Sequence, residues 1–389
     1  MTKLKQFSAL VAAMILTGAG ASASLIKLSE DTHLHLLADA SVVYQSNVFL
    51  LNTDFIPRIS DTYLLFSPGV ELRIAQHGSA SAVLRYQHSF KMYKHYSELD
   101  GDYSDLSLTA RYNPGRIMTS GYARYRQESS ADADGAIIGV RGRLIDRDHT
   151  DYGASLRYEI TQLTSVGTGV SYSKTDYDND ELYTDHSSIS VPVTLYYRVR
   201  PKIDLTAGLR YRDVDTSDST GQNPDYRDTY YFVGAVGELF TPVLYADVSV
   251  GVQERTYRGL QQDRSSATYN ISFIYTGDVK RTYYATLARD YRTSAIGGTT
   301  YTFSSGAIGA RYQMTNQIGF NAGLTYGESR YQFSPRAEDM WIFQLGATYN
   351  PNEYVSLAVR YEYTDVEGKT LGSATYQNSQ VRVSASLRY

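Results

Sequence analysis

The stretch that decides the fold is the last ten residues, Gln380-Val381-Arg382-Val383-Ser384-Ala385-Ser386-Leu387-Arg388-Tyr389. Apolar and polar side chains alternate strictly along it, from Val381 to the terminal Tyr389. A period of two residues predicts a β-strand with one apolar and one polar face. The fold of the whole chain then depends on whether this pattern is repeated.

The same alternation recurs along the chain, and it predicts about eighteen strands. We expect them near residues 34–46, 61–75, 80–93, 103–113, 117–128, 149–160, 164–176, 187–199, 203–213, 227–239, 243–257, 265–276, 282–292, 299–313, 317–331, 339–349, 354–364 and 374–389. The weakest are 227–239 and 282–292, where neither face is clean, so sixteen strands is the alternative. Eighteen is an even number, as single-chain bacterial barrels require, and a final strand ending in an aromatic residue is typical of such barrels.

Short and long connections alternate between these strands. The short ones are rich in Gly, Pro, Asn and Asp, as in Asn113-Pro114-Gly115 and Asn350-Pro351-Asn352, whereas stretches such as 129–148 and 213–226 are longer and polar. Outer-membrane barrels have short periplasmic turns and longer outer loops. Unpaired backbone groups are too costly in hydrocarbon, so the sheet must close on itself. The predicted fold class is therefore all-β, a transmembrane antiparallel up-and-down barrel, and this many strands leave an aqueous lumen.

The first residues predict export from the cytoplasm. Lys3 and Lys5 precede a short apolar run at 7–16, and Ala21-Ser22-Ala23 forms a small-x-small cleavage site. This is the pattern of a secretory signal peptide, and its apolar run is too short for a membrane helix. We expect a signal peptide at 1–23 and an outer-membrane β-barrel at 24–389, located in the cell outer membrane.

Composition excludes several classes of site and partner. The chain has no cysteine, so it has no disulfide framework and no thiolate metal site. The net charge of −4 does not favour a nucleic-acid partner. The 37 tyrosines, against 1 tryptophan and 12 phenylalanines, suit the headgroup level of a bilayer. The expected partners are therefore outer-membrane lipids and lipopolysaccharide.

If the apolar face points outward, many arginines point into the lumen. The predicted pore-lining set is Arg73, Arg85, Arg111, Arg124, Arg126, Arg157, Arg198, Arg210, Arg212, Arg311, Arg360 and Arg382. The inward acids are fewer, namely Asp39, Glu71, Asp105, Glu159, Asp204, Asp247 and Glu362. This excess predicts a lumen that favours anions, because rings of Arg and Lys select them. The alternative is that the arginines pair with these acids and neutralise one another.

The longest connection, 129–148, stands apart from the other outer loops. It contains an apolar stretch with Ile137 and Ile138, followed by Arg141 and Arg143. We hypothesise that this loop folds into the pore and constricts it, as the third outer loop does in general porins. The alternative is that it extends its two strands into a hairpin above the membrane.

Catalysis is not predicted. The seven histidines are scattered along the chain, without an H-E-x-x-H motif or a recognisable Ser–His spacing. The spacing Asp176-x-Asp178-x-Asp180 lacks the glycine and the distal glutamate of a calcium loop. We therefore expect no enzyme activity, no metal site and no cofactor.

Two short motifs carry a family resemblance. Tyr44-Gln45-Ser46-Asn47-Val48-Phe49 is similar to the (D)SN(I/V)F signature of the putative β-barrel porin 2 family, with Gln45 in place of the usual Asp. The stretch from Asn350 to Leu357, with Tyr361-Glu362-Tyr363, resembles a recurrent turn and penultimate strand of that family. Members often lie among exopolysaccharide genes and are proposed as ports for polymer. The resemblance therefore implies polysaccharide export and periplasmic export components as partners.

These observations together predict a passive pore that selects by diameter and wall charge. The expected cargo is an exported anionic polysaccharide, and the alternatives are a general diffusion porin for small anionic solutes or a non-conducting surface or adhesin barrel. The final strand should pair with the first near Leu36, Ala38, Ala40 and Val42. Tyr389 should lie at the periplasmic interface as an assembly signal for the barrel assembly machinery.

Overall fold

The computed structural model describes residues 26–29, 31–52, 57–75, 78–130, 145–178, 183–217, 225–239, 241–258, 262–293, 300–332, 334–370 and 373–389. Within these ranges the chain is almost entirely β-strand, and the one helical element is the 3-10 turn η1 (Ser97–Leu99). None of the helical structure in the described ranges has the length and apolar character to cross a lipid bilayer. The predicted signal peptide at 1–23 lies outside the described residues.

Nineteen strands are present in the described ranges. The first ten are β1 (Ile26–Ser29), β2 (Thr32–Gln45), β3 (Asp61–Ile74), β4 (Ala80–Tyr93), β5 (Gly101–Tyr112), β6 (Ile117–Ser130), β7 (Ile145–Glu159), β8 (Thr164–Tyr177), β9 (Asp185–Arg200) and β10 (Ile203–Ser217). The others are β11 (Tyr226–Glu238), β12 (Leu244–Tyr257), β13 (Arg264–Asp278), β14 (Arg281–Thr293), β15 (Thr300–Gln313), β16 (Ile318–Tyr331), β17 (Ala337–Tyr349), β18 (Val355–Gly368) and β19 (Tyr376–Arg388).

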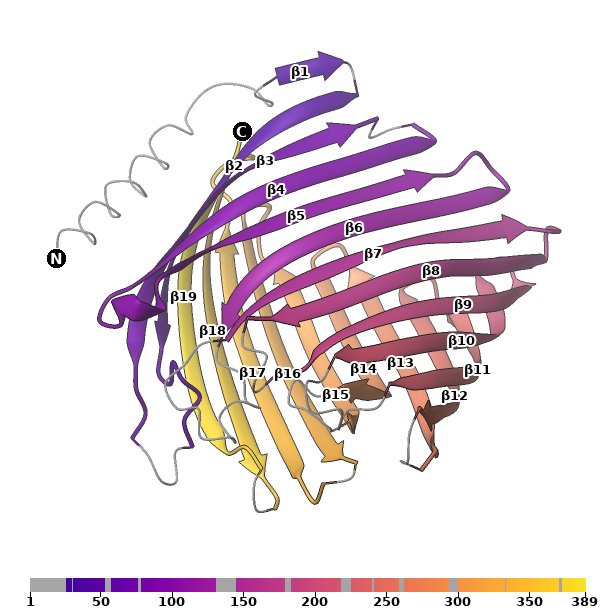
Figure 1. Cartoon of the computed structure of the whole chain (residues 1–389). Helices are drawn as coiled ribbons and strands as arrows, with labels where there is room; N and C mark the ends of the chain where they lie inside the picture. The colour runs from indigo at the N-terminus through magenta and orange to yellow at the C-terminus, as the bar shows by residue number, and fades with distance from the viewer. Residues whose placement is uncertain are drawn as a thin grey trace.

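Strands β2 to β19 form one closed antiparallel ring of eighteen strands (Figure 1). Each strand pairs with its neighbours in sequence, and β19 pairs with β2 to close the ring. The prediction of eighteen strands is thus confirmed over the alternative of sixteen. The two weakest predictions, near 227–239 and 282–292, are present as β11 and β14. The short β1 pairs with the start of β2 and was not predicted from the sequence.

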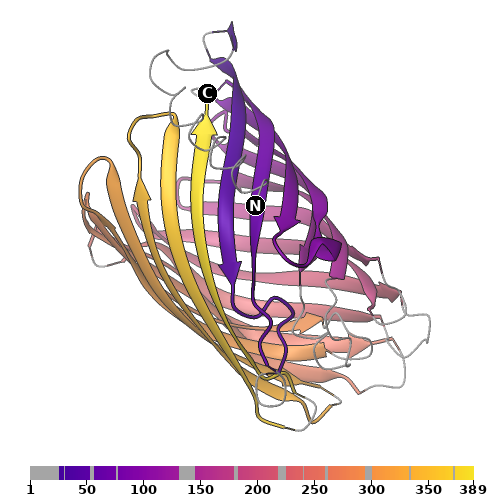
Figure 2. The ribbon, with the colours of Figure 1, turned by 90° about the vertical axis from the view of Figure 1, so that its left-hand side faces the viewer.

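The closure of the ring has the register that the sequence predicts. Val383 lies opposite Val42, Ala385 opposite Ala40, and Leu387 opposite Ala38. The amide of Leu36 donates to the carbonyl of Tyr389 at 2.7 Å, and the amide of Tyr389 donates back at 2.9 Å. Figure 2 shows β19, in yellow, beside β2, in indigo. The alternating apolar rows of the first and last strands thereby form one continuous surface.

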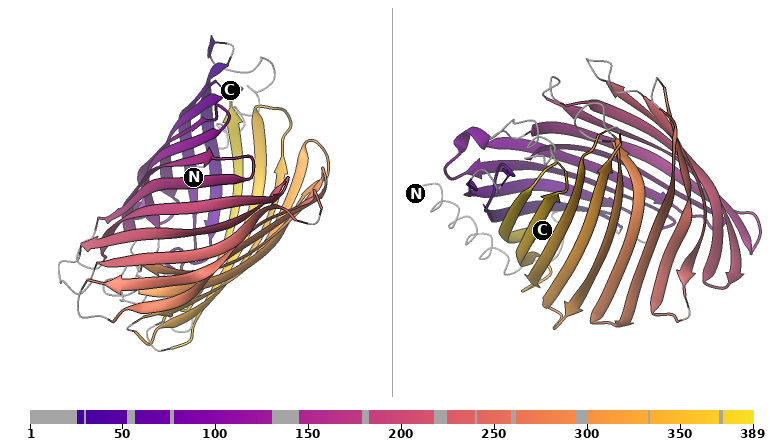
Figure 3. Two further views of the ribbon diagram at one scale, coloured as in Figure 1. Left: turned by 90° about the vertical axis from the view of Figure 1, so that its right-hand side faces the viewer. Right: turned by 90° about the horizontal axis from the view of Figure 1, so that it is seen from below.

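The two ends of the barrel differ in their connections. The end at which β2 begins and β19 finishes has short turns, such as the two residues 201–202 between β9 and β10. The opposite end has longer ones, such as residues 46–60 between β2 and β3. The further views in Figure 3 show the same ring of strands from the side and from below. By the rule for outer-membrane barrels, the end with short turns is periplasmic and the other is the outer mouth.

The two faces of the wall differ in composition. Large apolar side chains such as Leu84, Tyr86, Phe90 and Val383 lie exposed along one face, as expected for a lipid-facing surface. The described chain has no single large core. Its buried apolar side chains instead form small clusters, three of which join strand residues to residues of the outer connections.

Candidate functional site

A contact across the ring identifies the inner face of the wall. Arg210 on β10 reaches Asp290 on β14, with 3.4 Å between the guanidinium and carboxylate. Strands four positions apart in a closed ring meet only across its concave side, so both side chains point into the lumen. The strand registers then place all twelve arginines of the sequence prediction on this luminal face.

Eight of these twelve arginines form an ion pair with an acid. Arg73 contacts Glu71, Arg124 contacts Asp105, and Arg157 contacts Asp204, each at 2.6 Å. The eight arginines with an ion pair are Arg73, Arg85, Arg124, Arg126, Arg157, Arg198, Arg210 and Arg212. Pairing with acids, the alternative raised by the sequence, therefore describes most of these arginines, although Asp105 and Asp204 each serve two of them.

The remaining four, Arg111, Arg311, Arg360 and Arg382, form no ion pair within the described ranges. Two of them are neighbours, because Arg360 on β18 lies directly opposite Arg382 on β19. Like charges in this arrangement repel each other. The nearby Glu362 forms no ion pair within the described ranges either, and it accepts a hydrogen bond from Gln344 at 2.8 Å. A pair of uncompensated cations therefore faces the lumen on β18 and β19.

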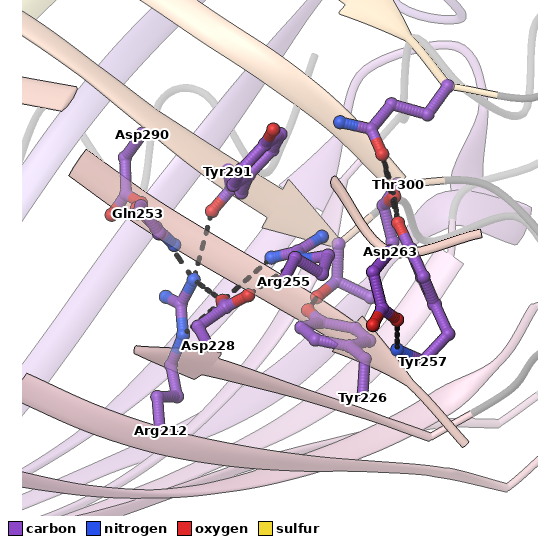
Figure 4. A network of polar contacts seen from close by, with 12 residues as sticks. Arg212, Tyr226, Asp228, Gln253, Arg255, Tyr257, Asp263, Asp290, Tyr291 and Thr300 are labelled. Carbon is purple, nitrogen blue, oxygen red and sulfur yellow. Dashed lines mark hydrogen bonds and ion pairs between the residues drawn. The ribbon is translucent and has the colours of Figure 1, made fainter. Parts of the chain in front are cut away.

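A buried polar network lies at the outer mouth on the side of β10 to β12 (Figure 4). Arg255 has no solvent exposure and donates to Asp228 from Nε at 2.7 Å and from Nη2 at 2.8 Å. The guanidinium of Arg212 contacts the same carboxylate and donates to the carbonyl of Tyr291 at 3.1 Å. Two arginines thus share one carboxylate, and the second ties it to β14.

This network connects strands that are not neighbours in the ring. The ladder between β13 and β14 ends where Tyr269 pairs with Arg289. Beyond that point β14 and β15 turn towards β11 and β12, and the hydroxyls of Tyr257 and Thr300 lie 2.7 Å apart. We call residues 289–293 and 300–303 the β14–β15 tip. It leans over the luminal face of β10 to β12. The sequence does not predict this position, because apolar and polar residues do not alternate regularly along β14.

The opposite side of the mouth is covered by the connection that follows β2. Asn47 is completely buried, and its Nδ2 donates to the carbonyls of Leu51 at 2.9 Å and Gln377 at 3.1 Å. Its Oδ1 accepts from the amide of Leu51 at 2.9 Å. Its own amide donates to Oδ1 of Asn378 at 3.1 Å. One side chain thereby fixes a tight loop and fastens it to β19.

Residues 46–51, which we call the inner ledge, lie against luminal side chains. Val48, Phe49 and Leu51 form a buried cluster with Val43, Tyr63 and Tyr93, whose side chains point inward from β2, β3 and β4. Leu50 packs on a second cluster that contains Val366 and Tyr376, from β18 and β19. The inner ledge therefore crosses the inside of the wall from β18 to β4. Residues 46–49 of the ledge belong to the family motif in the sequence, which does not predict their inward position.

The predicted constriction residues Ile137, Ile138, Arg141 and Arg143 lie outside the described residues. The flanks of that connection are described. Nε of Arg147 contacts Glu128 at 2.6 Å, and Nζ of Lys91 donates to the carbonyl of Ser129 at 3.4 Å.

The histidines at the outer rim pair with single acids. His95 contacts Asp61 at 2.9 Å, and His149 contacts Asp151 at 2.7 Å. Among the residues that the structure describes, no group of three or more His, Asp or Glu side chains is placed to hold a metal ion.

Comparison with solved structures identifies the fold. OpdO of Pseudomonas aeruginosa superposes with a TM-score of 0.51 at 14% identity, over 93% of this chain and 98% of that one. A BenF-like porin from Pseudomonas fluorescens Pf-5 gives 0.51 at 9% identity, over 93% and 100%. The FrpB iron transporter from Neisseria meningitidis, F5-1 variant in its apoprotein form, gives 0.50 at 9% identity, over 93% and 82%. At such identities these similar structures show the fold alone.

The sequence comparison is narrower. No curated protein matches the chain. A family model described as putative beta-barrel porin 2 matches residues 227–389, the half of the ring formed by β11 to β19. A pore-forming role is thereby supported, and the protein is an outer-membrane β-barrel in which the predicted resemblance to the putative beta-barrel porin 2 family is confirmed over these nine strands.

Proposed function

We propose that the barrel is a passive conduit through which anionic polysaccharide leaves the cell. The observation that carries the proposal is the pair Arg360 and Arg382, two uncompensated cations side by side on the luminal wall. A carboxylated polymer passing this pair would relieve the repulsion between the two guanidinium groups. Because the other luminal arginines are largely paired with acids, the attraction is local and does not trap the cargo along the whole pore.

Luminal aromatic rings support a saccharide cargo. The ring of Tyr284 lies over Gly309 on the next strand, where a Cβ would come within 2.2 Å of its Cζ. The ring of Phe232 lies similarly over Gly208, 2.8 Å from the position of a Cβ. The strand registers place both side chains on the luminal face, where their rings offer apolar surface to a saccharide. One solved structure of this fold, OccK2 of Pseudomonas aeruginosa, is in complex with glucuronate, a carboxylated sugar.

Diffusion of small anionic solutes is the second candidate function. It uses the same Arg360 and Arg382 pair, and it is favoured by the eight arginines in ion pairs, whose charge is partly compensated by acids on the wall. The two candidates differ in what blocks the pore. A conduit for polymer should be entered and blocked by a polyuronate chain, whereas a diffusion pore should pass only its short fragments.

Planar-bilayer recording of the purified full barrel tests the proposal. We expect anion preference in reversal potentials, and block by polyuronate but much less by neutral dextrin of equal length. The double variant R360Q/R382Q should lower the anion-to-cation permeability ratio by roughly half, because a local cation pair dominates selectivity. The charge-matched control R111Q/R311Q removes the same charge elsewhere and should change it less. Cation preference of the wild-type pore, or equal effects of the two variants, would contradict the role of the pair.

Partners in the periplasm follow from the export proposal. A polymer must reach the lumen through a periplasmic assembly, so we expect the barrel to be recovered with polysaccharide-export components after crosslinking in cells. Steady conductance with passage of small anions, but no block by polyuronate and no such crosslinks, would favour the diffusion porin. Binding without any conductance would favour the surface or adhesin barrel.

A further inference from the structure

The outer mouth of the barrel is covered from two facing sides. The inner ledge, residues 46–51, is fixed next to β2, and the β14–β15 tip leans over β11 and its neighbours. In a ring of eighteen strands, β2 and β11 are nine positions apart and so lie opposite each other. Both elements occupy the luminal side of the wall, because both contact inward-pointing side chains.

The inner ledge is held rigidly. Its apolar underside is buried, with Val48 only 1% exposed, and Asn47 is fastened on one side to Leu51 and on the other to β19. Leu50 has φ of 48°, in the left-handed region that residues with a Cβ seldom adopt. A conformation of this kind persists only where the surroundings fix it. The ledge therefore has a defined conformation that its contacts with the barrel wall fix.

We propose that the inner ledge and the β14–β15 tip form a two-sided constriction of the pore, and that Asn47 is the positioning residue that fixes its width. The proposal rests on the pore-forming role but not on the identity of the cargo. It assigns the constriction to the first outer connection of the described ring. Arg382 lies below it, opposite Val43, on which the ledge packs. Solutes that enter from the outer mouth and pass the constriction therefore reach Arg360 and Arg382 next.

The substitution N47A tests this assignment in the purified full barrel. Without the amide, the ledge loses its hydrogen bonds to Leu51 and Gln377 and should leave the wall. We expect single-channel conductance and the largest polyethylene glycol that enters the pore both to increase, the conductance by roughly twofold, since both follow the narrowest cross-section. The matched control N270A changes a luminal asparagine on β13, remote from the ledge, and should leave both unchanged.

A cysteine probe separates release of the ledge from general damage. The chain has no native cysteine, so V48C introduces a single thiol at a buried position. A charged, membrane-impermeant thiol reagent should modify V48C slowly and N47A/V48C quickly. A compact band that shifts on heating verifies that each variant has folded. Ion selectivity should stay close to the wild-type value in N47A, which distinguishes this proposal from that for the arginine pair.

Two results would overturn the proposal. One is an unchanged conductance and size limit in a folded N47A barrel whose Val48 position has become reactive, because the ledge would then be released without widening the pore. The other is a thiol that stays protected without Asn47, because Asn47 would then not position the ledge.

Discussion

Asn47 and Asp228 show how single polar residues organise the outer mouth. Each is buried, and each joins segments that are distant in the chain. Asp228 accepts from both Arg212 and Arg255, so one negative charge compensates two positive ones. Arg255 also places its guanidinium 3.8 Å above the ring of Tyr226, which the arginine shields from solvent. At this scale the mouth is stabilised by buried polar contacts. Replacing a single partner by an apolar side chain would leave the other partner buried without its bond.

The substitution D228N should destabilise the barrel strongly. It leaves Arg255 as a buried, uncompensated charge and leaves Arg212 with Asp290 as its acidic partner. Removing one partner of a buried ion pair in this way costs about 3–5 kcal/mol. Urea unfolding of the refolded protein, followed by tyrosine fluorescence or by heat-shifted mobility, measures the change. The control D247N alters a luminal acid on β12 that has no ion pair within the described ranges, and it should change stability by only about 0.5 kcal/mol. Equal effects of D228N and D247N would show that the network adds nothing to stability.

At the scale of elements, the strands lie where the alternation of apolar and polar residues predicts them. Their pairing at the outer ends does not follow from that alternation. β14 keeps its partner β13 as far as Arg289 and then departs from it. Within the strands, close packing restricts which residue fits at some positions. At Gly251 on β12, an added Cβ would come within 1.8 Å of the carbonyl oxygen of Tyr231 on β11. That strand pair therefore depends on a glycine at this position.

The substitution G251A should weaken the pairing of β11 and β12. The clash is with backbone, which has to shift, and overpacking of this kind costs about 1–3 kcal/mol. The matched control is G121A on β6, where the nearest atom to an added Cβ is 3.6 Å away, an ordinary contact. Unfolding midpoints in urea compare the two variants. A midpoint for G251A equal to that for G121A would show that the wall adjusts without loss.

At the scale of the whole molecule, Tyr389 extends the ladder between β19 and β2 that closes the ring. The amide and carbonyl of Tyr389 both pair with Leu36, and its ring lies 6.2 Å from that of Tyr354. Each net hydrogen bond contributes about 0.5–1.5 kcal/mol, and closure also removes the exposed edges of the sheet. The structure thus places Tyr389 where the two ends of the sheet meet, at the end of the barrel with short turns.

Deletion of Tyr389 should therefore lower the yield of folded barrel in the outer membrane. The variant Y389F keeps the aromatic ring and both backbone groups, so it should assemble like the wild type. The fraction of heat-shifted protein in outer-membrane extracts measures both. Normal assembly of the deletion variant would argue against an assembly role for this residue.

By itself the sequence predicted the eighteen strands of the ring, their antiparallel order, the register of closure and a luminal set of twelve arginines. It could do so because side chains along a strand in a membrane wall alternate between lipid and lumen. A shift of the strand register by one residue would turn a whole row of side chains from lipid to lumen. Even β11 and β14, the least regular strands, were found in this way.

Only the tertiary structure decided which luminal charges remain uncompensated and what lies across the mouth. Both depend on contacts between strands far apart in the chain, as between Arg210 and Asp290, or Asn47 and Gln377. A period of two shows the face of a residue but not its partner across the ring. The direction in which a connection folds also depends on which apolar luminal side chains it covers. For this reason the inward position of the inner ledge could not be predicted from the sequence. It depends on contacts with β2, β3, β4 and β19 together.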